Sequence, residues 1–189
     1  MSVALPANLK MNVHDALASL EMGLLPIRQF EVGAGAQYRN PADPEVRLDF
    51  VTTEHRKAGM PVVLPELGLV LEPLKFMEFS LQGSTQGCVL AREGACMVNL
   101  PDPARYAVHK LIIFGERPVS ERTKASKDLI QAASLASFFS TRGPVESFNE
   151  VWRDALSRGR GWKARAMQGK TALLSLAPEL DDPRLWLED

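Results

Sequence analysis

Asp49 is the first candidate for chemistry, because it places a carboxylate inside an apolar segment. Residues 44–57 read PEVRLDFVTTEHRK, in which Val46, Leu48 and Phe50 alternate with Arg47, Asp49 and Val51. A period of two predicts a half-buried β-strand. The carboxylate is either a solvated group on an exposed sheet face or a ligand held on a rigid platform. The strand alone favours the solvated interpretation, since polar outward residues are the norm on such sheets.

A cluster of cations lies in HKLIIFGERPVSERTKASKD, residues 109–128. Lys110 falls late in one expected helix and Arg117 in the following turn, while Lys124 and Lys127 open the next helix. Cations in a first helical turn are disfavoured by the helix dipole. A bound anion would compensate, because backbone N–H and ammonium groups together make a phosphate site. The alternative is neutralisation by nearby acids, namely Glu116, Glu121 and Asp128.

A second basic stretch is VWRDALSRGRGWKARAMQGK, residues 151–170, which has a net charge of +5. Trp152 and Trp162 are interleaved with its cations, and such a pattern suits a nucleic-acid backbone and its exposed bases. On this hypothesis the strip, in particular Arg158, Arg160 and Lys163, binds an acceptor RNA. The alternative is a solvated helix face whose tryptophans pack inward.

The other reactive side chains show no catalytic or metal-binding spacing. His14, His55 and His109 are scattered, and a packed or hydrogen-bonded His109 is the preferred interpretation. Cys88 and Cys96 are spaced for neither a disulfide framework nor a zinc site. Because both lie in short apolar segments, we expect buried free thiols and a reducing cytoplasm.

The elements that must position these residues fall into two halves. Residues 13–22 predict a short helix, residues 28–51 an antiparallel strand pair, residues 74–83 a helix, and residues 87–100 two strands around an REGA turn. Asp102 and Pro103 are helix-start signals, and amphipathic helices follow over 120–143 and 144–159. We therefore expect an α/β (α+β in detail) chain, with sheet and helices over 1–100 and a helical region over 101–189.

Composition excludes several classes of protein. The chain has 189 residues, 46% of them hydrophobic, and a net charge of −1, which is an ordinary balance for a globular protein. No apolar run approaches the ~20 residues of a membrane helix, so no membrane partner is expected. The first residues lack the pattern of a secretory signal.

An ordered set of segments carries a resemblance: VRLDFVTTEHR, LEPLKFMEFSLQ, VNLPDPARYAVHKLIIFGER and TKASKDLIQAASL. Together they resemble a bacterial family of nucleotidyltransferase-fold proteins of the DNA polymerase β-type superfamily, distantly similar to the nucleotidyltransferase toxins of abortive-infection systems. The resemblance covers roughly residues 12–175. It implies a mixed sheet carrying three carboxylates, two of them from a Gly-Ser turn followed by an acidic-x-acidic strand.

The resemblance also implies roles for named residues. Asp49, in RLDF, matches the third carboxylate and would hold Mg²⁺ or act as a base, since nucleotidyl transfer uses hard divalent cations with oxygen ligands. Lys110 and Lys127 would contact the phosphates of an NTP, with Arg117 and Lys124 as neighbours. Asp128 would orient Lys127 or accept from an incoming hydroxyl. Asp49 should then face a pocket lined by these lysines.

The chain departs from the family pattern in one respect. It contains no Gly-Ser turn followed by an acidic-x-acidic strand, so we expect those motifs to lie before residue 1. A lone carboxylate cannot assemble a two-metal site, because water would supply most of the remaining ligands. Two functions stay open: transfer of a nucleoside monophosphate from NTP to an RNA or protein acceptor, and a catalytically incomplete module that binds nucleotide, nucleic acid or a partner chain. The second predicts self-association or partner pairing at the sheet edge left by the missing strands.

Overall fold

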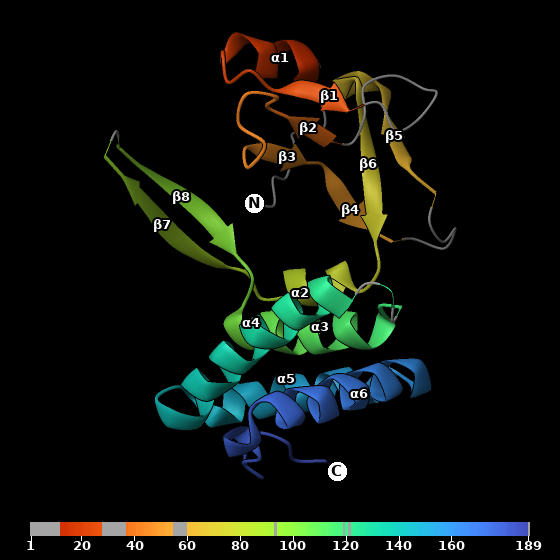
Figure 1. The fold of residues 1–189 in the computed structure, drawn as a ribbon, viewed down its shortest axis with the longest axis vertical. Coiled ribbons are helices and arrows are strands. Elements are labelled where there is room, and N and C mark those ends of the chain that lie inside the picture. The colour runs from red at the N-terminus through yellow and green to blue at the C-terminus, as the bar shows by residue number, and fades with distance from the viewer. Residues whose placement is uncertain are drawn as a thin grey trace. The chain divides into compact units, whose positions relative to one another are not determined.

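A computed structural model describes residues 12–27, 37–54, 60–92, 94–118, 120 and 122–188 (Figure 1). The fold is α+β, as expected. The chain forms two compact units, Ser2–Met77 and Glu78–Asp189. The domain boundary predicted near residue 101 stays a prediction; residue 101 lies between a β-hairpin and the long helices.

The unit Ser2–Met77 contains short strands and one helix. Helix α1 (Val13–Ser19) starts at Asn12, whose Oδ1 accepts the N–H groups of His14 and Asp15. Strands β1 (Leu25–Ile27), β2 (Gln37–Arg39) and β3 (Arg47–Asp49) form an antiparallel sheet in that order. The β2–β3 pair confirms the pairing predicted within residues 28–51, of which 28–36 lie outside the described residues.

A second sheet in the same unit has β6 (Leu69–Leu74) at its centre. Strand β4 (Val51–Thr53) pairs with β6 in parallel, and β5 (Val62–Leu64) pairs with it antiparallel. A 3₁₀ turn, η1 (Pro65–Leu67), joins β5 to β6. Apolar side chains of α1, η1 and β6 form a small core: Val13, Leu67 and Leu69, with Leu17, Phe50, Leu64 and Leu71 packed against it.

The unit Glu78–Asp189 contains a hairpin and the main helices (Figure 1). Helix α2 (Met77–Leu81) begins at the last residue of the other unit, and the strands β7 (Thr85–Ala91) and β8 (Gly94–Leu100) follow it in the chain. The long helices are α3 (Pro103–Glu116), α4 (Arg122–Thr141), α5 (Val145–Ser157) and α6 (Arg160–Leu176), and a 3₁₀ turn, η3 (Pro178–Leu180), follows. Asp102 caps α3 by accepting the N–H of Arg105 at 2.9 Å, as the sequence predicts.

The helical core consists of the inward faces of α3, α4, α5 and α6. Its largest fully buried side chains include Trp152, Phe148, Leu111 and Ile112. Helices α3 and α6 approach closely: a Cβ on Gly169 would lie 2.3 Å from the Leu111 carbonyl oxygen, and one on Gly115 would lie 2.5 Å from that of Arg165. Glycine therefore lets the two backbones meet.

Two local predictions need correction. The helix predicted from Leu74 begins at Met77, because Leu74 is the last residue of β6. Cys88 and Cys96 are free but exposed, not buried. An apolar strand has a buried face only where another element covers it, and the β7–β8 hairpin extends away from the helices of its own unit (Figure 1).

None of the described helices combines the length and the apolar character that crossing a membrane requires.

Candidate functional site

Asp128 is the centre of the cation cluster. Its side chain is buried, with a relative exposure of 3%. Its Oδ1 accepts from Lys110 Nζ at 2.9 Å, and its Oδ2 accepts from Arg117 Nε at 2.8 Å. Lys110 comes from α3, Arg117 from the cap of α3, and Asp128 from α4. The three side chains therefore tie the end of one helix to the start of the next.

This arrangement favours neutralisation by local acids over a ready-made anion site. A carboxylate with both oxygens engaged by cations compensates charge that a phosphate would otherwise have to balance. Glu116, the second acid considered, pairs with Arg165 of α6 instead. Lys127 is exposed on α4. The side chain of Lys124 and the whole of Glu121 lie outside the described residues.

His109 lies beside this cluster on α3. Burial lowers its pKa to about 4, and the neighbouring Lys110 ammonium lowers it too, against an opposing effect of Asp128. Neither ring nitrogen is accessible or has a hydrogen-bond partner among the described residues. His109 is therefore a packed neutral imidazole, consistent with the preferred interpretation of the sequence.

Asp49 ends β3, the edge strand of the β1–β2–β3 sheet. Its side chain is 40% exposed, and its Oδ2 lies 4.0 Å from Arg47 Nε. A solvated carboxylate on the strand is what the alternation predicts. Asp49 belongs to the unit Ser2–Met77, and Lys110 and Lys127 belong to the other unit. That these residues line one pocket stays a prediction.

The described parts of the chain do not bring together the ligands of a Mg²⁺ site: no three His, Cys, Asp or Glu side chains gather there as metal ligands. Asp49 contributes one carboxylate at most, whereas a catalytic magnesium site needs several oxygen ligands. The described residues therefore do not fit a complete metal site.

The basic stretch is largely neutralised within its own unit. Asp154 accepts from Arg105 at 2.8 Å and from Arg158 at 3.0 Å. Both guanidinium groups lie over the Phe79 ring, at 5.0 and 4.9 Å from its centroid. Burial opposes ionisation of Asp154, but the hydrogen bonds from Arg158 and Arg105 outweigh it and lower its pKa.

Other residues of the stretch 151–170 are also paired or packed within the unit. Lys163 and Lys170 lie 3.6 and 3.8 Å from the Glu188 carboxylate, and Trp152 is fully buried, as the inward-packing alternative expects. Trp162 packs against Phe79 with ring centroids 5.6 Å apart.

Arg160 is exposed at the start of α6. Of the three cations assigned to RNA, Arg158 and Lys163 thus have acidic partners within the unit, and Arg160 is the most open to an external anion.

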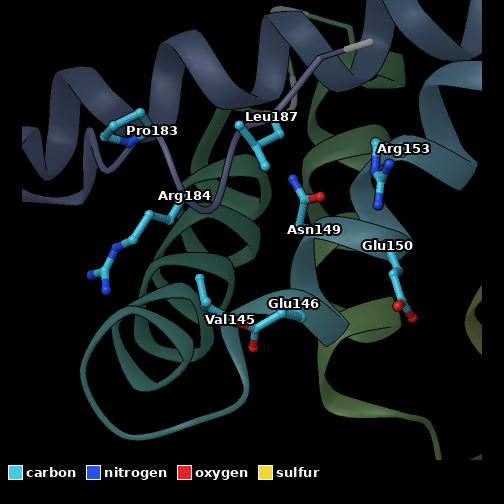
Figure 2. A pocket seen from close by; sticks show the side chains of 8 residues that line it. All are labelled: Val145, Glu146, Asn149, Glu150, Arg153, Pro183, Arg184 and Leu187. Atoms are coloured by element: carbon cyan, nitrogen blue, oxygen red, sulfur yellow. The ribbon is translucent and has the colours of Figure 1, made fainter.

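A cavity of about 470 Å³ lies between α5 and the C-terminal segment that follows η3 (Figure 2). Figure 2 shows the Asn149 amide pointing toward the segment that carries Leu187. Asn149 is buried, and its Nδ2 has no hydrogen-bond partner among the described residues. Sequence reasoning missed this cavity, because the C-terminal segment carries no periodic signal. Of the basic stretch 151–170, Arg153 lines it; Asp49, Lys110, Lys127 and Asp128 do not.

Comparison with known proteins gives one match. A family model described as nucleotidyltransferase matches residues 1–157, which is most of the chain. Neither the curated proteins nor the solved structures contain a match.

Proposed function

Because the chain belongs to the nucleotidyltransferase family, we propose that it takes part in transferring a nucleoside monophosphate from NTP to a hydroxyl of an RNA or protein acceptor. The family match over residues 1–157 is the observation that carries this proposal. In such a transfer the acceptor oxygen attacks the α-phosphorus, pyrophosphate leaves, and the hydroxyl proton must go to a base.

Asp49 is the residue of this chain proposed for that site. It is accessible, and it projects from a strand paired along its length with β2, which gives a carboxylate a defined position. Mg²⁺ would accompany the NTP, but the described residues supply only part of its ligands. Lys127 is the exposed cation proposed for the phosphates. Lys110 and Arg117 would reach a phosphate only by giving up Asp128.

A second function is favoured by the same geometry. The chain would bind nucleotide or nucleic acid without catalysing transfer, as a module completed by another polypeptide at its sheet edge. The lack of a three-ligand cluster in the described parts of the chain favours this module over transfer. Because Asp128 engages Lys110 and Arg117, the exposed Lys127 is the cation left for a phosphate. Either function suits the cytoplasm, because Cys88 and Cys96 are exposed free thiols that a reducing compartment would preserve.

Nucleotide transfer and nucleotide binding can be measured separately. The full chain is incubated with each α-labelled NTP, Mg²⁺ and bulk RNA, and covalent label on RNA and on protein is quantified. Titration calorimetry with Mg·ATP gives the affinity. If the chain catalyses transfer, Asp49→Asn should abolish labelling, whereas Glu45→Gln, which changes an exposed carboxylate on the preceding turn, should not.

The outcomes separate the two functions. Binding without labelling, weakened by Lys127→Ala, would support the incomplete module. Heats that are identical for wild type, Asp49→Asn and Lys127→Ala would remove the assigned residues from the site. No labelling with any of the four nucleotides would contradict the transfer, and no heat on titration with Mg·ATP would contradict the binding of that nucleotide.

A further inference from the structure

The β7–β8 hairpin has unusual exposure for an apolar ribbon. Twelve of its fourteen strand residues are exposed; the two exceptions, Gly87 and Val98, pair with each other. Leu90 is 78% exposed and Met97 61%, and they lie on the same face. The opposite face shows Val89 at 50%. Both faces thus present apolar side chains to solvent.

The hairpin also lacks the usual protection of a free sheet edge. Neither strand contains a charged residue, although natural edge strands commonly carry charges, above all lysine, to prevent pairing with other chains. Its two strands pair only with each other in the sheets that the described residues form. A two-stranded ribbon is marginally stable by itself in water and gains stability from added strands.

We propose that β7–β8 is a self-association surface, on which two copies of this chain pair edge to edge as an antiparallel four-stranded sheet. The absence of charge selects this occupant. A nucleic acid would require cations on the strands, and a bilayer would leave the unpaired edge groups unsatisfied. A charge-free strand, by contrast, meets no repulsion from its own copy across a two-fold axis.

The strand lengths define the expected register. Cys88 is the central residue of β7, and Met97 is the central residue of β8. Full antiparallel overlap of identical strands puts the central residue opposite its own copy, with Cα atoms about 4.5–5.5 Å apart. That separation lies within the range of a disulfide. A cross-link at position 88 therefore reports pairing through β7, and one at position 97 reports pairing through β8.

The oligomeric state tests the proposal directly. Sedimentation velocity of the full chain, from micromolar to near-millimolar concentration under reducing conditions, should show a monomer–dimer equilibrium. Leu90→Lys/Met97→Lys should raise the dissociation constant by at least about tenfold, because lysines on an edge strand oppose its pairing with another chain. Ile130→Lys, at a 58% exposed apolar position on α4, is the matched control and should leave it unchanged. Circular dichroism establishes that each variant is folded.

Cross-linking then identifies the edge. If the copies pair through β7, mild oxidation of Cys96→Ser should give a dimer linked by Cys88. If they pair through β8, mild oxidation of Cys88→Ser/Cys96→Ser/Met97→Cys should give a dimer linked at position 97. A wild-type chain that is monomeric throughout the concentration range would overturn the proposal. So would a Leu90→Lys/Met97→Lys variant that dimerises as tightly as wild type.

Discussion

A single carboxylate, Asp128, holds two cations that the sequence assigned to phosphate. The sequence indicated that cations and acids were clustered, but not which of them paired, because Lys110 and Arg117 lie 18 and 11 residues away from their partner. Their pairing depends on how α3 and α4 pack. The nearby Lys127 stays exposed, so neighbouring positions on one helix have opposite environments.

Asp128→Asn should destabilise the protein by about 2 to 4 kcal/mol, because it leaves two partly buried cations without their counter-charge. Urea unfolding followed by circular dichroism measures the effect. Lys127→Ala is the control and should stay within about 0.5 kcal/mol of wild type. Equal effects of the two substitutions would show that the Asp128 ion pairs contribute little.

His109 predicts a pH dependence of stability. Its native pKa is lowered to about 4, so in the interval from about 6.5 down to 4 the unfolded chain binds a proton that the native state does not. The free energy of unfolding should therefore decrease as the pH is lowered, by about 2 kcal/mol between pH 7 and pH 5. Asp154 and Asp182 have lowered pKa values, and their contributions are lost at lower pH.

The free energy of unfolding is measured across this range for wild type and for His109→Gln. The variant should show a flatter profile between pH 7 and pH 5, whatever its stability at pH 7. Parallel profiles would mean that another group causes the pH dependence.

At the scale of elements, the sequence correctly predicted the features that depend only on residues close together in the chain. The Asp102–Pro103 start of α3 and the pairing of β7 with β8 both depend on short-range chemistry, and both are present. Burial of the cysteines was wrong, because apolar composition does not reveal whether a strand is covered. The close approach of α3 and α6 has no sequence signal beyond two glycines inside helices.

Gly169→Ala tests that close approach. Alanine favours a helix over glycine by about 1 kcal/mol, yet its Cβ would lie 2.3 Å from the Leu111 carbonyl oxygen. We expect a net destabilisation of about 1 to 3 kcal/mol. Gly161→Ala is the matched control on the same helix, because its Cβ meets only the flexible end of Arg165. Thermal unfolding should show it at or above the wild-type midpoint.

At the scale of the whole molecule, the family match ends at residue 157, yet the core of the helical unit includes side chains from the C-terminal segment that follows η3. Trp186 is buried against Phe148 and Trp152, with ring centroids 5.3 and 5.0 Å apart. Its Nε1 donates to the Leu180 carbonyl at 2.8 Å. The C-terminal segment thus completes the core of this unit.

Trp186→Ala should cost about 3 to 5 kcal/mol, whereas Leu187→Ala, at a 52% exposed neighbour, should cost less than about 0.5 kcal/mol. Chemical denaturation monitored by far-ultraviolet circular dichroism measures both. A chain truncated after Ser157 should bind a hydrophobic dye and lose cooperative unfolding. Retained cooperativity in that fragment would show that residues 158–189 are dispensable for folding.

The pairing of Trp152 with Trp186 also has an optical consequence. Two indoles 5.0 Å apart and inclined at 82° are close enough for their excited states to couple, so the docked C-terminal segment should give a near-ultraviolet dichroism signal that disappears when it detaches. The protein therefore carries an intrinsic, label-free reporter of whether that segment is seated.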